Sequence, residues 1–224
     1  MKGSIIYSDI PNACPEERRN PMCGRYYIAD DETNAEIRKI CNEITMKYQN
    51  TSPCVPMITG EIRPTNAAPV LIAQQQTTQP ELMTWGYPKW QGSGVVINAR
   101  AETAAEKPLF RPSISQRRCI IPSNGFFEWD HVEGHVKSKF LLQSKESPVL
   151  YMAGLYTYFE DKYGSKYSAY VILTVDANAS VRPIHDRMPL IVEPGKNDQW
   201  LHDEKYARAV MLTPCLAELS AIMT

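Results

Sequence analysis

The chain has 224 residues, of which 43% are hydrophobic and 22% are charged, and its formal net charge is −1. A chain of this size and composition builds one packed domain, with or without extensions, and needs no disulfides to hold it together. The balanced charge argues against a protein that coats long DNA duplexes by bulk electrostatics. Any nucleic-acid contact therefore depends on a local basic patch.

The six cysteines form no Cys-x-x-Cys pair and no zinc-finger spacing. No stretch approaches the roughly 18 apolar residues of a membrane span, and the apolar run at the start of the chain is too short for a signal peptide. We therefore expect a cytoplasmic protein with reduced thiols, no membrane contact, no metal and no cofactor.

Residues 1–21 contain three prolines and the charged run Glu16-Glu17-Arg18-Arg19, without any hydrophobic period. We expect them to form a leader outside the core, followed by one domain over residues 22–224. Cys23 comes directly after Met22, so translation from Met22 and trimming, or cleavage of the Met22–Cys23 bond, would make it the first residue. The third alternative is that the leader persists and this form of the chain forms no cross-link. We favour the start at Met22.

A helix is predicted next, because Thr33 and Glu36 form a capping box. Ile37, Ile40, Cys41 and Ile44 share its apolar face, which predicts that Cys41 belongs to the core. Several later runs rich in Val, Ile, Tyr and Phe predict strands. These are residues 70–73, 81–85, 94–97, 118–121, 125–129, 139–143, 149–155 and 167–175, with a hairpin tip at 161–164.

A second helical region is predicted over residues 197–221, which contain Trp200, Leu201, Val210 and Leu212. The predicted fold is therefore a compact, sheet-dominated α+β domain with barrel-like sheets flanked by helices.

Three polar residues interrupt predicted strands and are candidates for proton transfer. Glu128 lies between Phe127 and Trp129, so it is either a solvated edge carboxylate or a carboxyl with a raised pKa in an aromatic setting. His185 precedes Asp186 and is either a turn residue or a proton donor near physiological pH. Asn98 is either a turn residue or the acceptor that orients an amine.

Several cations and one tryptophan are candidates for DNA contacts. Arg100, Arg111, Arg117 and Arg187 are either solvated or form a cradle for phosphates. Trp90 is either a core residue or a side chain that stacks on a base.

Four motifs contain most of these residues. They are Met-Cys-Gly-Arg-Tyr at 22–26, Asn-Ala-Arg-Ala-Glu-Thr at 98–103, Arg-Cys-Ile-Ile-Pro-Ser-Asn-Gly-Phe-Phe-Glu-Trp at 118–129 and Ile-His-Asp-Arg-Met-Pro at 184–189. Together, and in this order, they resemble the signatures of the SRAP (SOS response-associated peptidase) family. The resemblance covers about residues 22–220, although the tail from 217 lacks the further strand that the family usually adds.

The resemblance implies a monomer that binds single-stranded DNA and cross-links itself to abasic sites, shielding the lesion in the DNA damage response. It implies that Cys23 is the nucleophile, that Asn98 positions its α-amine, and that Glu128 and His185 move protons. Arg25, Trp90, Arg100, Arg111 and Arg187 are the expected DNA contacts. The family also carries an autopeptidase label, in which the residues before the cysteine are removed.

The chemistry of an N-terminal cysteine is consistent with this expectation. Its α-amine has a pKa of about 7.7–8 and can attack an aldehyde near neutral pH, after which the thiol closes a thiazolidine ring. We expect cations such as Arg25 to make the thiol a better nucleophile. Two alternatives stay open: a cysteine peptidase or amidase using Cys23, His185 and Glu128, and a non-catalytic single-strand binding module.

Overall fold

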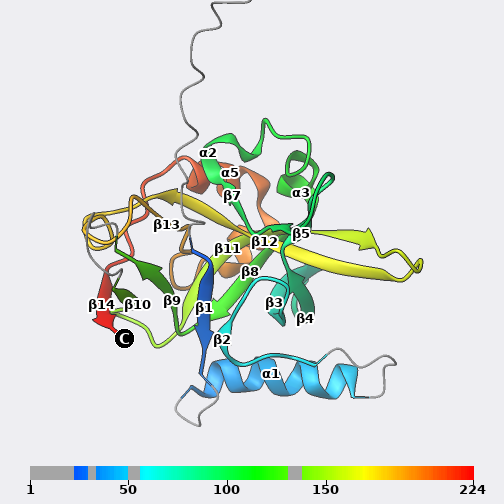
Figure 1. Cartoon of the computed structure of the whole chain (residues 1–224), viewed down its shortest axis with the longest axis horizontal. Coiled ribbons are helices and arrows are strands. Elements are labelled where there is room, and N and C mark those ends of the chain that lie inside the picture. Colours follow the sequence, from blue (N-terminus) through cyan, green and yellow to red (C-terminus); the bar gives the residue numbers. More distant parts are fainter. Residues whose placement is uncertain (1–22, 30–33, 50–55, 131–137) are drawn as a thin grey trace, which may run out of the picture.

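The computed structural model describes residues 23–29, 34–49, 56–130 and 138–224. The predicted leader, Met22 and Thr33 lie outside the described residues. Within the described residues, strands dominate and form two large sheets and one small one (Figure 1). None of the described helices is long and apolar enough to span a membrane.

The largest sheet closes into a barrel. Its strands follow the order β11-β8-β3-β4-β12, and β12 pairs again with β11, which joins the two ends of the sheet. Two short strands, β7 and β13, add to β12. The bounds are β3 Ala67–Gln74, β4 Thr77–Trp85, β7 Asn98–Arg100, β8 Arg118–Ser123, β11 Leu150–Glu160, β12 Lys166–Asp176 and β13 Arg187–Pro189. The expected sheet-dominated α+β fold with barrel-like sheets is confirmed.

The second sheet has the order β14-β10-β9-β1-β2 and is antiparallel throughout. Its strands are β1 Arg25–Ile28, β2 Gly60–Ile62, β9 Gly125–Trp129, β10 Lys139–Ser144 and β14 Leu219–Met223. A small hairpin joins β5 Tyr87–Pro88 to β6 Val95–Val96. Gly86 precedes β5 with a φ of +113°, and a Cβ there would meet the Val95 side chain at 2.6 Å, so glycine is required.

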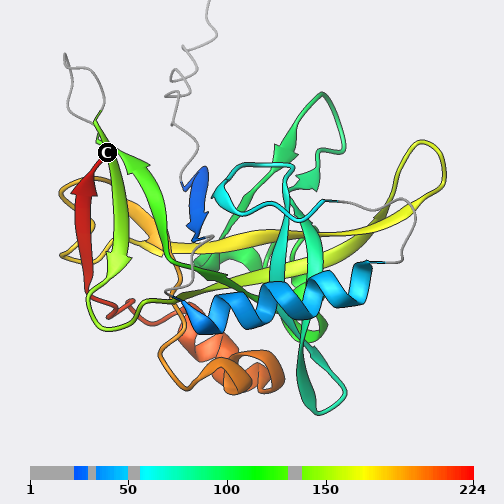
Figure 2. The same cartoon turned by 90° about the horizontal axis from the view of Figure 1, so that it is seen from below.

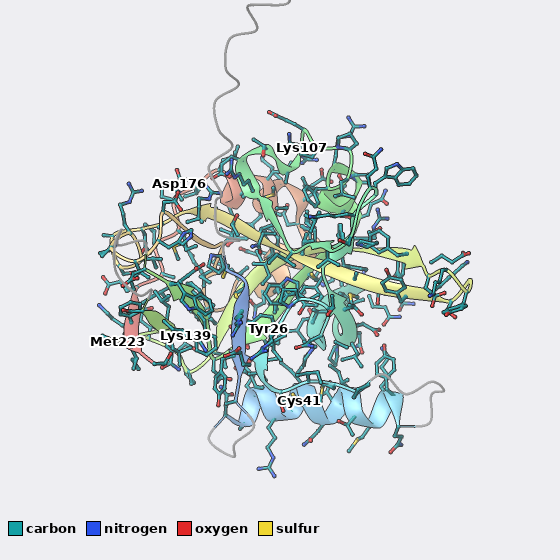
Figure 3. All side chains as sticks on the ribbon, in the orientation of Figure 1. Tyr26, Cys41, Lys107, Lys139, Asp176 and Met223 are labelled. Carbon is teal, nitrogen blue, oxygen red and sulfur yellow. The ribbon has the colours of Figure 1, made fainter. Side chains whose placement is uncertain are left out.

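Three aromatic side chains join the second sheet to the barrel. The Tyr26 hydroxyl of β1 lies 2.5 Å from the Tyr170 hydroxyl of β12, and both residues are fully buried. The Tyr26 ring also packs edge-on against Trp85, which stacks on Tyr170 with an interplanar angle of 7°. Tyr26 therefore lies in the interior (Figure 3) and fixes β1, and with it the adjacent Cys23, against the barrel.

Helix α1, Ala35–Tyr48, crosses one side of the molecule (Figure 2). Its N-cap is Asn34, whose side chain accepts a hydrogen bond from the Ile37 amide, so the expected cap at Thr33 is wrong by one residue. Ile37, Ile40 and Ile44 are buried as predicted, whereas Cys41 is only half-buried at the margin of that face. The remaining helices are α2 Ala101–Ala104, α3 Arg111–Gln116, α4 Asn197–His202 and α5 Glu204–Met211.

The C-terminal end differs from the sequence-based expectation. The predicted helical region ends with α5 at Met211, and Pro214 follows where it cannot continue a helix. Residues 219–223 form β14, which pairs with β10 from Leu219–Ser144 to Met223–Phe140. Pairing with β10 and burial of Leu219 stabilise a strand there, so the expected lack of a further strand is also wrong.

Candidate functional site

The backbone of Cys23 faces a buried carboxyl group. Cys23 is fully buried, and its backbone N–H donates a hydrogen bond of 2.5 Å to Oε1 of Glu128, a residue of β9 that is only 2% exposed. The antiparallel register explains this contact, because Arg25 pairs with Phe127 and the chain before Arg25 therefore runs alongside Glu128. Cys23 also has a φ of +46°, an uncommon conformation for a residue other than glycine, which costs about 1–3 kcal/mol.

The pKa of Glu128 is raised to about 8, mainly by burial and in smaller part by the negative charge of Asp186, while hydrogen bonds from the Cys23 and Trp129 amides act in the opposite direction. The carboxyl group therefore holds or releases a proton near neutral pH. Of the two interpretations of Glu128, the structure excludes the solvated edge carboxylate, because burial in the β9 core removes it from water.

The Cys23 thiol is protonated in this environment. Burial raises its pKa well above the ordinary value, and the charge of Glu128 raises it further. The expectation that Arg25 activates the thiol is therefore wrong. Arg25 instead donates a hydrogen bond of 2.6 Å to Glu61 and lies over the Trp129 ring at 5.2 Å.

His185 is buried in the turn that leads into β13. Its Nδ1 accepts a hydrogen bond of 3.0 Å from the Arg187 backbone N–H, so the neutral ring carries its proton on Nε2. Nδ1 also lies 3.0 Å from Oδ1 of Asp186, a contact that becomes attractive when the ring is charged. The hydrogen bond from the Arg187 backbone N–H determines the tautomer of the neutral ring, because a backbone N–H can only donate. The Asp186 side chain is 84% exposed to water, so its contact with Nδ1 is the weaker of the two.

The segments that hold Asn98 and His185 flank the same end of β12. Strand β7 pairs with it in parallel, with Asn98 opposite Ile172, and β13 pairs along the other edge, with Arg187 opposite Asp176. The charge of Asp186, the neighbour of His185, acts on Glu128. The structure thus joins Cys23 to Glu128 directly, links the His185 turn to them through charge, and places Asn98 at the neighbouring edge of the barrel.

Arg187 lies in a network of carboxylates. Its guanidinium group donates to both carboxylate oxygens of Glu102 at 2.5 and 2.9 Å, to Asp176, and to the Thr174 carbonyl at 2.8 Å. The side chain is only 10% exposed. Arg187 therefore ties β13 to α2 and to the end of β12, the region of Asp176 in Figure 3.

The other predicted DNA contacts lie at the surface. Trp90 is 97% exposed in the segment between β5 and β6, which excludes the core interpretation. Arg100 and Arg111 are exposed at the starts of α2 and α3. Among the described residues, neither arginine forms an ion pair.

The sequence analysis did not identify Glu61 and Lys139, two charged residues that form an ion-pair network with Arg25. Glu61 of β2 also accepts a hydrogen bond of 2.6 Å from Lys139, whose Nζ lies 3.9 Å from the centre of the Phe127 ring. Burial pushes the pKa of Glu61 up, but hydrogen bonding to Lys139 and the charges of Lys139 and Arg25 lower it overall. The only sequence signal was the lysine that starts a predicted strand, and its partner Glu61 is far away in the chain.

In the described part of the chain, no group of three or more His, Cys, Asp or Glu side chains is arranged to hold a metal ion. The groups placed for chemistry are a thiol, a carboxyl and an imidazole. They are suited to nucleophilic attack and proton transfer.

The family model for the SOS response associated peptidase (SRAP) matches residues 22–223. The chain belongs to this family. The match begins at Met22, the residue before Cys23.

Named relatives agree with the family match. The abasic site processing protein YoaM of Bacillus subtilis is 33% identical over 154 residues, which cover 64% of this chain and 68% of the relative. The abasic site processing protein YedK of Escherichia coli is 29% identical over 202 residues, which cover 87% of each chain. A crystal structure of a protein from Bacteroides thetaiotaomicron has a TM-score of 0.72 at 26% identity and covers 90% of this chain and 91% of its own.

The raised pKa of Glu128 predicts a specific pH dependence of stability. The unfolded carboxyl titrates near pH 4.3, whereas the folded one titrates near 8. Between these values the folded state binds more protons, so the free energy of unfolding decreases as the pH rises. We expect Glu128→Gln to remove this decrease, which is on the order of a few kcal/mol, in urea unfolding measured from pH 5 to 8.

Glu61→Gln is the matched control. The folded pKa of Glu61 is lowered, so its contribution to stability is present above the unfolded pKa and is lost as the pH falls. Over pH 5 to 8 Glu61 is ionised in both the folded and the unfolded state, so Glu61→Gln should lower the free energy of unfolding by a constant amount and leave its slope with pH unchanged, whereas Glu128→Gln should change the slope. Parallel curves for wild type and Glu128→Gln would contradict the assignment of a protonated buried carboxyl.

Proposed function

We propose that this protein processes abasic sites in single-stranded DNA by forming a covalent cross-link through Cys23, in the form of the chain that begins at Cys23. Two observations support the proposal: the relatives named abasic site processing proteins, and the motifs that this chain shares with its family. The observation that carries the chemistry is the hydrogen bond from the Cys23 backbone nitrogen to the buried Glu128 carboxyl. A free α-amine at that nitrogen would contact a group that titrates near neutral pH.

The first step is the attack of the Cys23 α-amine on the aldehyde carbon of the ring-opened sugar. Glu128, whose pKa of about 8 keeps it protonated near neutral pH, gives its proton to the departing hydroxyl and takes up the proton that the nitrogen loses, so that water leaves and an imine forms. During ring opening, His185 in its charged form donates the Nε2 proton to the sugar ring oxygen, while the hydroxyl on the carbon that becomes the aldehyde gives its proton to water. Asn98 accepts a hydrogen bond from the amine.

The second step is ring closure by the thiol. The Cys23 sulfur attacks the imine carbon, a C–S bond forms, and the thiol proton moves to the nitrogen, which gives a thiazolidine. Because the pKa of the resting thiol is raised, the thiol stays protonated until the imine is present to receive that proton. The order of steps is therefore amine first and sulfur second.

The raised thiol pKa also bears on the alternative of a cysteine peptidase acting on other proteins. Such an enzyme needs a thiolate, and burial of Cys23 works against one. We further propose that the working form begins at Cys23, either because translation starts at Met22 and the methionine is trimmed or because the chain cleaves itself before Cys23. Intact mass of the protein from its native cell identifies the first residue, and an active form that begins at Met1 would refute this part.

Protein beginning at Cys23 should form a heat-stable, slower-migrating band with a single strand that carries one abasic site. The matched control is the same strand after borohydride reduction, which converts the aldehyde to an alcohol that the amine cannot attack. A heat-stable band with the reduced strand, or peptide turnover without any band, would refute the cross-linking proposal.

Cys23→Ser in the same form of the chain keeps the α-amine but replaces the thiol by a poorer nucleophile. We expect an imine that is trapped by borohydride and lost on heating, measured by gel shift with and without reductant. A heat-stable adduct without reductant would show that the sulfur is not needed.

His185→Ala should slow adduct formation by about 10²–10⁴-fold, the usual contribution of a general acid, because no group donates to the sugar ring oxygen. The affinity for an intact single strand should change less than tenfold, measured by fluorescence anisotropy. A larger loss of affinity with an unchanged rate at saturating DNA would make His185 a binding residue instead.

A further inference from the structure

The barrel is open along part of the β4–β12 boundary. These parallel strands form only two register pairs among the described residues, Thr84 with Ala169 and Trp85 with Tyr170. Continuing that register would pair residues 81–83 with residues 166–168. These six residues instead line a cleft of about 760 Å³.

The two hairpins that contribute to the cleft diverge from each other (Figure 2). The β3–β4 hairpin and the β11–β12 hairpin project in different directions, and one end of α1 lies near the space between them. Strand β4 is paired on its other edge with β3, and β12 with β11. The two facing edges are therefore not paired with each other over residues 81–83 and 166–168, and the Tyr48 hydroxyl hydrogen-bonds one of their backbone groups, at Leu82.

The cleft is lined by four tyrosines from three elements: Tyr48 of α1, Tyr156 and Tyr158 of β11, and Tyr167 of β12. Tyr158 is 64% exposed, and its ring packs edge-on against Tyr156 at 6.0 Å and 82°. Its register partner is Ser168, whose small side chain leaves space beside the ring. An aromatic ring held on one side and open on the other is suited to stacking with a planar ligand.

The charges of the cleft are balanced. Its lining includes one carboxylate, Glu81, and one ammonium group, Lys166. Glu81 also accepts hydrogen bonds from the Tyr48 hydroxyl and from Lys47, which lies outside the lining. Burial, and then the contact with Glu81, raises the pKa of Tyr48 to about 12, so its hydroxyl stays protonated. A lining without net charge favours a neutral base over a phosphate.

The cleft and the candidate site lie along one strand. Ser168 lines the cleft, and Thr174 lies between the paired residues of β7 and β13. They are six residues apart on β12, which corresponds to about 20 Å, and they share one face. Tyr170 lies between them on the same face and contacts Tyr26 of β1.

We propose that the tyrosine-lined cleft binds an unpaired nucleobase of the same DNA strand whose abasic site lies at Cys23. This inference rests on the proposed function and adds a second contact, in which Tyr158 stacks on the base. Because single-strand stacking on aromatic side chains tolerates any base, the cleft would supply affinity without sequence preference.

The test compares Tyr158→Ala with Tyr163→Ala. Tyr163 is a matched control, because it lies near the tip of the same hairpin, is 80% exposed, and does not line the cleft. Affinity is measured by fluorescence anisotropy for intact single strands of about 4 to 16 nucleotides, the usual range of single-strand site sizes. Tyr158→Phe keeps the ring and shows whether stacking is sufficient.

We expect Tyr158→Ala to weaken binding of the longer strands about tenfold and to leave the shortest strands unaffected. The salt dependence should stay the same, because no phosphate contact is lost, and Tyr158→Phe and Tyr163→Ala should bind like wild type. Equal affinities for all variants, or an equal loss in Tyr163→Ala, would overturn the proposal.

Intact strands contain no aldehyde, so this measurement does not depend on the cross-link. A Tyr158 effect in a protein that forms no adduct would refute the covalent function and support the base site. Normal adduct formation without a Tyr158 effect would support the covalent function and refute the base site.

Discussion

The candidate site depends on one buried carboxyl group that faces the backbone nitrogen of Cys23. Glu128 lies in β9, which pairs with β1 on one side and β10 on the other, and the residue is only 2% exposed to water. The exclusion of water raises its pKa to about 8, and the same exclusion keeps the Cys23 thiol protonated. Proton transfer near neutral pH and a resting neutral thiol thus have one physical cause.

The barrel provides the rigid base for this site. Pairing of β11 with β12 closes it, and the Tyr26–Tyr170 contact anchors β1 to its wall. A displacement of β1 by one register step would turn the alternate face of the strand toward the barrel and move Cys23 away from Glu128. The aromatic contacts therefore determine the geometry of the site although none of them takes part in the chemistry.

Positive and negative groups near the site are organised in two separate networks. Glu102 and Asp176 bind Arg187 on the side of β13, and Glu61 binds Arg25 and Lys139 on the side of β1. In each network carboxylates hold cations in place before any ligand is present. Arg187 is only 10% exposed within its network, so among these cations Arg25 and Lys139 are the more accessible to solvent.

The sequence by itself determined the element types and the chemical groups. Runs rich in Val, Ile, Tyr and Phe predicted β3, β8 and β12, the helical period predicted the buried isoleucines of α1, and the motifs identified Cys23, Asn98, Glu128 and His185 as candidates. Only the tertiary structure decided which groups meet and in which protonation state. The contact between Cys23 and Glu128 spans 105 positions in the chain, and the pKa of each depends on burial by distant strands.

The same reason explains the wrong predictions. Residues 219–221 were included in the predicted helical region but belong to β14, which pairs with the edge of β10. Arg25 contacts Glu61 rather than the thiol because β2 pairs with β1. Local pattern reports the preference of a segment, whereas strand pairing and water exclusion are properties of the assembled fold.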